Sequence, residues 1–516
     1  MATGEWTHEM GGQTANMGPD GRKWTHEMGG QTANMGPDGR KWTHEMGGQT
    51  PNMGPDGRKW THEMGGQTTN MGPDGRKWTP GMGGQTTIIE SNERSEVTSL
   101  GREFVTVFMQ NHEFKETPQL ELLVTGTKPS TSVTITINKS DFRKEVKVGN
   151  GETISVPITT NVEMSGTDTS PNSIVIKADF GVTVVSRSYK DGSGDTALLY
   201  PVRLWGVEYY IITPPWGADG AYTEFSVIGY ESPTVINIYL KGAVSFQGQD
   251  YPKDSKLTLT LEPFQAIQIQ STDDLSGTKV VADHPVAVLS GHTCTEKNGD
   301  CGHVYVQLLP VASWGSSFFV PGISFQPKSD IAFIMSAQDT CIEYQSGEKI
   351  ENRNVVAGEL MQLEVTKSSP LFIHANEKIQ VLFYGTGGTF NDIPFDPLLT
   401  NIQSTEHYGT AYELIGQDKF ETNLAIIVSK TTAESGITVD GKLPEGIVWR
   451  EIPGSEYSWA EYKFGSGFSY HTMQHLSVPF GLLIFGCSSS LTYGYLAPCI
   501  KAPVLTGSVV EGKLKF

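Results

Sequence analysis

A weak internal repeat after residue 100 constrains the fold of this chain more than any other feature of its sequence. Four times, at intervals of about 100 residues, an apolar residue followed by glycine opens a series of short β-branched runs. The openings are Leu100-Gly101, Trp205-Gly206, Trp314-Gly315 and Tyr408-Gly409. Such a period indicates one structural unit repeated along the chain. The glycine permits either positive φ or close approach of a neighbouring backbone, and we expect the preceding large side chain to pack at the boundary between units.

The runs within each unit predict β-strands. Apolar and polar residues alternate in segments such as 132–137, 153–158 and 235–240, and clusters of Gly, Asn, Asp, Ser and Pro separate the segments. This pattern is typical of half-buried antiparallel strands joined by turns. Almost nothing has the pattern of a long amphipathic helix. The sequence therefore predicts an all-β protein.

We predict four tandem β-sandwich-like modules of about 95–110 residues, because two facing sheets bury the alternate apolar residues of both. A β-propeller is the alternative, and the sequence does not separate the two arrangements. The predicted modules are 96–200, 201–308, 309–402 and 403–503, followed by a tail at 504–516.

Residues 1–95 form a different kind of sequence. Tryptophan recurs there every 18 residues, at Trp6, Trp24, Trp42, Trp60 and Trp78, within nearly identical copies rich in glycine. Each copy has few large apolar side chains, so we expect this tract to be disordered. A neutral expansion and a flexible, weakly adhesive arm are both compatible with it.

The charge and hydropathy of the chain exclude two classes of partner. The formal net charge is −19 and no cluster of Lys and Arg is present, which argues against nucleic acid. No apolar run approaches the roughly 20 residues that span a bilayer, so no membrane span is expected. Met1–Trp6 has neither the basic nor the apolar region of a secretory signal, so any expectation of secretion must come from elsewhere in the sequence.

The spacing of two cysteines and two histidines allows two interpretations. His292, Cys294, Cys301 and His303 flank a short turn-like loop. A disulfide between Cys294 and Cys301 would close this loop, whereas all four side chains are of the types that bind tetrahedral zinc. Cys487 and Cys499 could form a second disulfide that staples a hairpin, which leaves Cys341 over.

The sequence offers a glycosylation site but no catalytic motif. Asn138-Lys139-Ser140 is an acceptor sequence for N-glycosylation if the chain is secreted. A nucleophile elbow, a Walker-type loop and a dinucleotide-binding glycine motif are all absent from the sequence. We therefore expect a protein that is not an enzyme and has no cofactor.

Several separate stretches resemble the N-terminal region of the IgG Fc-binding proteins of mucus. Two of them read DHPVAVLSGHTC and CGHVYVQLLPV. In chain order the stretches are Gly101–Asn111, Asp283–Cys294, Cys301–Val311, Ile379–Gly385, Ser435–Gly441 and Pro453–Tyr457. The resemblance covers roughly residues 95–500, and it also favours the disulfide over the zinc site.

The resemblance implies a secreted, extracellular protein of mucus that binds immunoglobulin Fc or mucus glycoproteins through loops on a β scaffold. The alternative is a structural component of a mucin-type gel that does not bind Fc. The repeats at residues 1–95 depart from the family pattern, and the von Willebrand D-type modules that follow this region in the family are not in the sequence. The resemblance assigns no ligand-contact residues.

Overall fold

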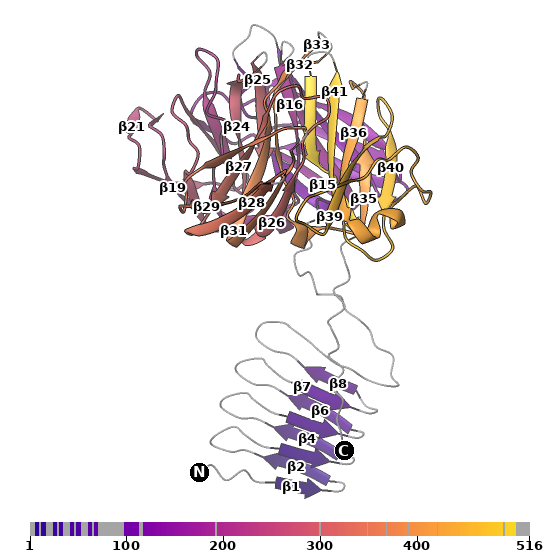
Figure 1. Ribbon diagram of the computed structural model, residues 1–516. Helices are drawn as coiled ribbons and strands as arrows, with labels where there is room; N and C mark the ends of the chain where they lie inside the picture. The colour runs from indigo at the N-terminus through magenta and orange to yellow at the C-terminus, as the bar shows by residue number, and fades with distance from the viewer. Residues whose placement is uncertain are drawn as a thin grey trace. The chain divides into compact units, whose positions relative to one another are not determined.

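The structure is a computed structural model. It describes residues 98–501 except 113–116, 191–192, 299–300, 348, 368, 391–392, 421 and 489–490, and it describes the backbone of eight short strands between residues 6 and 70. The chain divides into two compact parts, Met1–Ser95 and Glu96–Phe516 (Figure 1). We call them the repeat tract and the β body.

The repeat tract contains two parallel sheets, each with four strands. Their orders are β1-β3-β5-β7 and β2-β4-β6-β8. Each strand pairs with its own copy one repeat later, as in Trp6 with Trp24, because identical copies bring the same backbone pattern into register. The strands are β1 (Trp6–Glu9), β2 (Gly12–Asn16), β3 (Trp24–Glu27), β4 (Gly30–Asn34), β5 (Trp42–Glu45), β6 (Gly48–Asn52), β7 (Trp60–Glu63) and β8 (Gln67–Asn70). Disorder was expected throughout 1–95, and these strands differ from that prediction; the rest of the tract lies outside the described residues.

The β body consists almost wholly of strands, which confirms the all-β prediction. One pairing pattern recurs in four stretches, which we call units I to IV. Unit I holds β9 (Gly101–Thr106), β10 (Gln119–Gly126), β11 (Thr131–Ile137), β12 (Arg143–Val148), β13 (Thr153–Ile158), β14 (Asp168–Ser170), β15 (Ile174–Lys190) and β16 (Ser193–Leu198). Unit II holds β17 (Gly206–Tyr210), β18 (Thr223–Ile228), β19 (Thr234–Tyr239), β20 (Val244–Phe246), β21 (Gln249–Tyr251), β22 (Lys256–Leu261), β23 (Ala266–Ser271), β24 (Lys279–Thr295) and β25 (Gly302–Gln307).

Units III and IV continue the series. Unit III holds β26 (Gly315–Val320), β27 (Asp330–Ser336), β28 (Thr340–Ser346), β29 (Lys349–Val355), β30 (Met361–Val365), β31 (Leu371–Gly385), β32 (Gly388–Phe390), β33 (Ile393–Phe395) and β34 (Leu398–Asn401). Unit IV holds β35 (Ala411–Ile415), β36 (Thr422–Lys430), β37 (Thr438–Val439), β38 (Arg450–Glu451), β39 (Tyr457–Lys463), β40 (Tyr470–Gln474), β41 (Gly481–Ser488), β42 (Leu491–Leu496) and β43 (Cys499–Lys501). The described 3-10 helices are η1 (Thr160–Val162), η2 (Val202–Leu204), η3 (Val311–Ser313), η4 (Thr405–His407) and η5 (Thr431–Gly436).

A long bent strand organises each of units I to III. In unit I the first half of β15 pairs with β9 and β11, and its second half pairs with β10 and β16. Strands β24 of unit II and β31 of unit III also pair with different strands along their first and second halves. In unit IV the long strand is replaced by β40 and β41, between which lies Pro479, which has no N–H for a ladder. The two halves face each other across apolar side chains, so each unit is a small two-layered body.

The glycine that opens a unit marks a close approach to the start of the next unit. A Cβ atom on Gly101 would lie 2.3 Å from Cβ of Pro201, and one on Gly206 would lie 2.4 Å from Cβ of Pro310. Each of these prolines precedes a 3-10 helix that leads into a buried tryptophan. Of the two possibilities stated for these glycines, close approach is therefore the correct one, although a side chain and not the backbone approaches.

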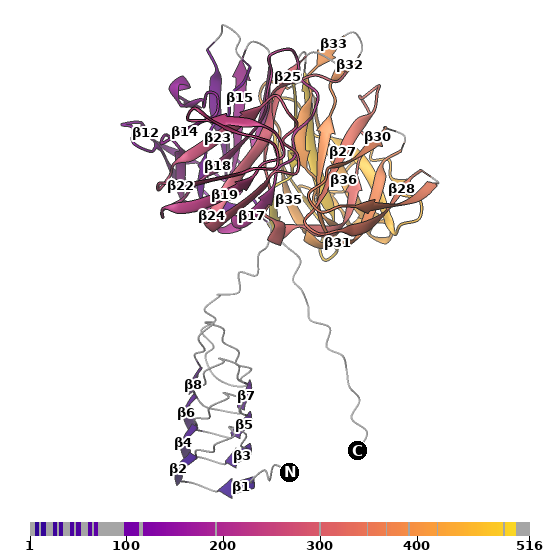
Figure 2. The ribbon, with the colours of Figure 1, turned by 90° about the vertical axis from the view of Figure 1, so that its left-hand side faces the viewer.

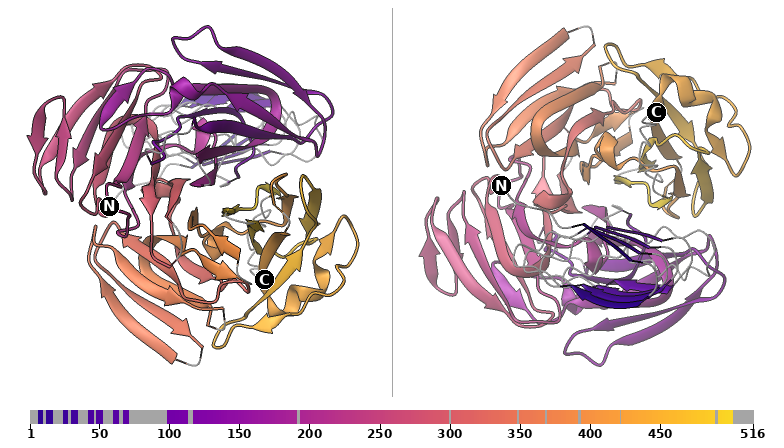
Figure 3. Two further views of the ribbon diagram at one scale, coloured as in Figure 1. Left: turned by 90° about the horizontal axis from the view of Figure 1, so that it is seen from above. Right: turned by 90° about the horizontal axis from the view of Figure 1, so that it is seen from below.

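The four units surround a common axis. Strands near the ends of the units meet there: β16 contacts β25 and β42, and β34 contacts the same two strands (Figure 3). The short strand β14 of unit I also belongs to the sheet of unit II, where it pairs with β23 (Figure 2). Two-layered units are thus placed in a ring, and the choice between tandem sandwiches and a propeller stays a prediction.

A buried aspartate ties three units together at this axis. Asp195 on β16 is fully buried, and its carboxylate accepts hydrogen bonds from the backbone N–H groups of Thr196 at 2.7 Å, Tyr305 at 3.3 Å and Leu399 at 3.3 Å. Burial raises the pKa of Asp195 well above its usual value. The backbone of units II and III is therefore positioned by a side chain of unit I.

Units I and IV close the ring through charged and polar contacts. The guanidinium of Arg187 on β15 is fully buried; it donates from Nε to Glu121 at 2.7 Å and lies 2.6 Å from a carboxylate oxygen of Asp418 in unit IV. The carboxylate of Glu413 on β35 accepts hydrogen bonds from the hydroxyls of Thr183 at 3.0 Å and Tyr470 at 3.1 Å. Burial raises the pKa of Glu413 to about 7.

Candidate functional site

The structure joins Cys294 and Cys301 in a disulfide. Cys294 lies near the end of β24 and Cys301 directly before β25, with 5.2 Å between their Cα atoms. The neighbouring histidines are buried: Nδ1 of His292 accepts from the amide of Cys294 at 3.0 Å, and Nδ1 of His303 lies 3.1 Å from the carbonyl oxygen of His292. Burial lowers the pKa of His292 to about 3 and that of His303 to about 4, so both are neutral at physiological pH.

This disulfide favours the first of the two interpretations of His292, Cys294, Cys301 and His303. Zinc binds cysteine as a thiolate, and here both sulfur atoms are bonded to each other. In the described part of the chain, no group of three or more His, Cys, Asp or Glu side chains is placed to hold a metal ion. The four residues instead tie β24 to β25 beside the axis of the ring.

The remaining candidate residues from the sequence are dispersed. Asn138 is half-exposed in the turn after β11, and its Nδ2 donates to the carbonyl of Pro171 at 2.8 Å. Cys341 is half-buried on β28 and carries a free thiol. Cys487 lies on β41 and Cys499 on β43, in different sheets of unit IV. Glycosylation of Asn138 and a Cys487–Cys499 disulfide both stay predictions.

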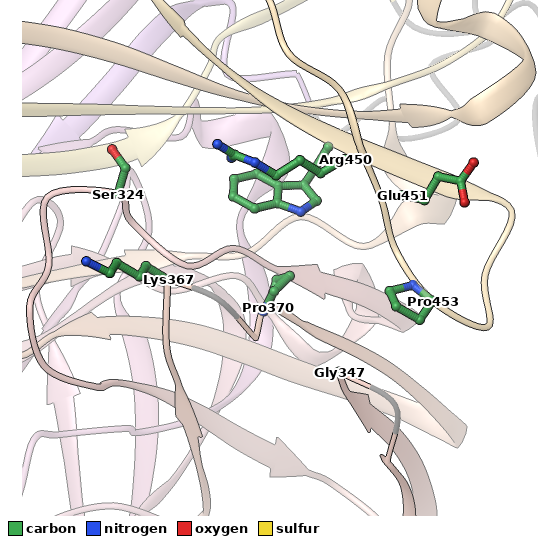
Figure 4. Close-up of a pocket in the computed structure, with 8 residues that line it drawn as sticks. Ser324, Gly347, Lys367, Pro370, Arg450, Glu451 and Pro453 are labelled. Atoms are coloured by element: carbon green, nitrogen blue, oxygen red, sulfur yellow. The ribbon is translucent and has the colours of Figure 1, made fainter.

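A cleft between units III and IV is the strongest candidate for a ligand site. Its volume is about 360 Å³. Loops of unit III form one wall, and β38, β39 and the turn between them form the other (Figure 4). The lining residues are Ser324, Gly347, Lys367, Pro370, Arg450, Glu451, Pro453 and Trp459.

An aromatic side chain positions one cation of the cleft. Arg450 and Trp459 are cross-strand partners, and the guanidinium of Arg450 lies over the indole, 4.7 Å from the ring centroid. Trp459 is only 4% exposed, and its ring packs against Phe319 of β26 with 6.2 Å between centroids. Because a cation over the face of an indole is attracted to it, this stack holds Arg450 in a defined orientation at the cleft.

The charged side chains that line the cleft are distributed along its length. Lys367 and the guanidinium of Arg450 lie at one end with the hydroxyl of Ser324, and Glu451 lies at the opposite end (Figure 4). In the residues described here, no carboxylate oxygen lies within 4.0 Å of the charged nitrogens of Lys367 or Arg450. Glu461 lies nearby, and one of its oxygens accepts from the backbone N–H of Ser324 at 3.1 Å.

A second hollow shows a different charge pattern. It measures about 270 Å³ and lies wholly within unit III. Its lining includes one lysine, Lys349, and two carboxylates, Glu351 and Glu364. Glu351 already accepts a hydrogen bond from the hydroxyl of Tyr344 at 2.6 Å and pairs with Arg353 at 3.0 Å. Glu351 of this hollow is therefore already paired, whereas the described cations of the cleft have no carboxylate partner.

Sequence reasoning did not find the cleft. Lys367 and Arg450 are separated in sequence by most of one unit, and neither belongs to a motif. The stretch Pro453–Tyr457 was singled out only for the family resemblance, and its first residue does line the cleft. A signal was available in the rarity of cations, since the chain has 38 Lys and Arg against 57 Asp and Glu.

The chain matches one protein family and one curated relative. The profile of the family described as IgGFc binding protein matches residues 195–486. An IgGFc-binding protein of Homo sapiens is 36% identical over 409 residues, which make up 78% of this chain and 8% of that protein. The chain thus spans a small part of the length of this relative.

Solved structures show only distant likeness. A Ca²⁺-stabilised adhesin with which an Antarctic bacterium binds ice is 10% identical, covers 78% of this chain and 99% of its own, and gives a TM-score of 0.11. The major pilin protein of Streptococcus pyogenes is 8% identical, covers 77% of this chain and 99% of its own, and gives a TM-score of 0.13. Scores this low carry no argument about fold or function.

No helix in the described residues has both the length and the apolar character required to cross a membrane.

Proposed function

Because this chain belongs to the IgGFc-binding protein family, we propose that it is a secreted, non-enzymatic protein that binds immunoglobulin Fc or a mucus glycoprotein. The observation that carries the proposal is the family match over residues 195–486, which begins within β16 and ends within β41. Fc binding appears in the name of the human relative, and the matched segment covers 8% of that protein. The partner of this chain is accordingly part of the proposal.

The construction of the β body supports recognition of another macromolecule. Its strands are rigidly packed, and loops held on a rigid scaffold are where binding residues are most often found. Three large apolar side chains in loops of unit IV are exposed: Leu443 (66%), Val448 (65%) and Leu476 (93%). Exposed apolar side chains mark a partner-binding surface where they lie together, and these three belong to loops of the same unit.

Two features support secretion. The Cys294–Cys301 disulfide is of a kind that persists in oxidising compartments and is rare in the cytosol. Asn138 lies in an accessible turn where a glycan could be attached. Mass spectrometry of the natural protein would test both, through a glycan on Asn138 and a Cys294–Cys301 crosslinked peptide.

Surface plasmon resonance would test the proposed partner. We expect the full-length chain, when immobilised, to bind purified IgG Fc or purified mucin and not to bind Fab fragments. The triple variant Leu443→Ser, Val448→Ser and Leu476→Ser should weaken that binding, whereas Val235→Ser and Tyr239→Ser, exposed on unit II, should leave it unchanged. Absence of binding to both Fc and mucin would contradict the proposal.

A further inference from the structure

We propose that the cleft between units III and IV binds an acidic monosaccharide, a sugar ring that carries a carboxylate or a sulfate ester. This goes beyond the proposed function, because it assigns a small-molecule site and a ligand class that do not depend on Fc recognition. Lys367, Arg450 and Ser324 would bind the anionic group, and Glu451 would accept hydrogen bonds from sugar hydroxyls.

The two cations of the cleft come from different units of a chain that is acidic overall. Net charge is −19, and several other lysines and arginines at the surface are paired, such as Lys177 with Glu103 at 2.7 Å and Lys430 with Glu456 at 2.7 Å. Lys367 and Arg450 approach one hollow from two different units, yet neither has a carboxylate within 4.0 Å in the described residues. Two cations that line one hollow without a carboxylate partner attract an anion.

The orientation of Arg450 is prepared before any ligand arrives. Its guanidinium lies flat over the indole of Trp459, which is held in turn against Phe319. An arginine fixed in this way loses little side-chain entropy on binding, and its planar fork of N–H donors matches a carboxylate or a sulfate. Lys367 adds a point charge, and the hydroxyl of Ser324 adds a donor on the same side of the cleft.

The opposite end of the cleft selects against a bare inorganic anion. Glu451 lies there with its carboxylate directed away from Lys367 and Arg450, and this carboxylate accepts hydrogen bonds from hydroxyl groups but not from a sulfate or phosphate ion. Pro370 and Pro453 line the space between the two ends and offer apolar surface to the C–H groups of a sugar ring. A ligand that satisfies the whole cleft is anionic at one end, hydroxylated at the other and partly apolar between.

The size of the cleft limits how much of a glycan it holds. Its volume of about 360 Å³ lies at the small end of the range of about 300–1,000 Å³ for ligand sites. One sugar residue with its substituent fills such a space, and the neighbouring residues of an oligosaccharide would extend into solvent.

Saturation-transfer NMR and calorimetric titration of the full-length chain would test the proposal. The ligands are 3′-sialyllactose for the carboxylate, 6-sulfo-N-acetylglucosamine for the sulfate ester, and lactose as the neutral control. We expect at least one of the acidic sugars to bind, lactose not to bind, and the affinity to fall as salt is raised, since part of the attraction is between exposed charges. Which acidic sugar binds identifies the source of the anionic group.

Matched variants would locate the site. The double variant Lys367→Gln and Arg450→Gln should lower the affinity for the acidic sugar by about tenfold or more. This is the loss expected from one charge-assisted hydrogen bond. The double variant Arg102→Gln and Lys253→Gln removes the same charge from exposed positions outside the cleft and should leave the affinity within about twofold. Thermal unfolding of both variants would show that they are folded.

Three results would overturn the proposal: no binding of either acidic sugar, equal loss in both double variants, or binding of a short acidic peptide in place of the sugar. The Glu451→Gln variant sharpens the test, because it replaces the charged acceptor of sugar hydroxyls by a neutral one and should let inorganic sulfate compete more effectively with the sugar. A negative result here leaves Fc or mucin binding through the loops of unit IV intact, since that is measured separately.

Discussion

Unit IV meets its two neighbours in opposite ways. Against unit I, a fully buried Arg187 is held by the carboxylates of Glu121 and Asp418. Against unit III, Lys367 and Arg450 line an open cleft, and no carboxylate in the described residues pairs with them. The first interface uses a cation to close the ring, and the second leaves its cations available to a ligand. The comparison separates charges that stabilise the fold from charges that serve binding.

Replacement of Arg187 by methionine should have the largest effect. It leaves Glu121 and Asp418 without their cation at the closure of the ring, and removing one partner of a buried ion pair costs about 3–5 kcal/mol. We expect the midpoint of thermal unfolding to fall clearly. Arg102→Met, at an exposed position outside the interface, is the control and should change little. An unchanged midpoint for the Arg187 variant would show that the closure does not depend on this cation.

The pH dependence of stability should also be traceable to this closure. The pKa of Glu413 is raised to about 7 by burial, so the folded chain keeps this proton while the unfolded chain releases it near pH 4.5. The contribution of Glu413 is thus fully present below about pH 4.5 and is lost as pH rises toward 7, an effect on the order of 2–3 kcal/mol.

The Glu413→Gln variant keeps the hydrogen bonds with Thr183 and Tyr470 but cannot ionise. Chemical denaturation at several pH values should show that the difference between wild type and variant grows from pH 4.5 to 7 in favour of the variant. A constant difference across this range would mean that Glu413 does not hold a proton in the folded chain.

The sequence was informative about strands and much less so about interfaces. Alternation at 235–240 predicted a strand, and β19 lies at Thr234–Tyr239, because the period of side chains along a strand is local and visible in a single segment. Leu100-Gly101 and Trp205-Gly206 marked the starts of β9 and β17. At each of these glycines one neighbouring side chain leaves no room for a Cβ atom.

Ring closure and the cleft depend on residues that come together only in the folded chain. Arg187 and Asp418 belong to the first and last units, and nothing near either residue in the sequence indicates the other. The cation pair of the cleft is equally distant in sequence. The exchange of β14 into unit II was missed because Asp168–Ser170 is too short to show a period.

The Asp418→Asn variant would separate the contribution of Asp418 from that of Glu121 at the contact between units I and IV. Asp418 is 38% exposed at its side chain, and Arg187 keeps its contacts with Glu121 when this charge is removed. We therefore expect a loss of about 1 kcal/mol, much smaller than for Arg187 itself. A double-mutant cycle with Arg187→Met would measure the coupling directly. Coupling close to zero would assign the closure to Arg187 and Glu121 within unit I, with little contribution from unit IV.

The smallest effect on stability should come from the cleft. Lys367→Gln together with Arg450→Gln removes two cations without leaving a buried carboxylate behind, so the principal loss is the contact of Arg450 with Trp459. Such a contact at an exposed site contributes about 0.5–1 kcal/mol, and we expect the free energy of unfolding to fall by no more than this. The same variant should bind the acidic sugar much more weakly than the wild type. If stability instead fell as far as for Arg187→Met, the cleft cations would be part of the framework, and the distinction between the two faces of unit IV would fail.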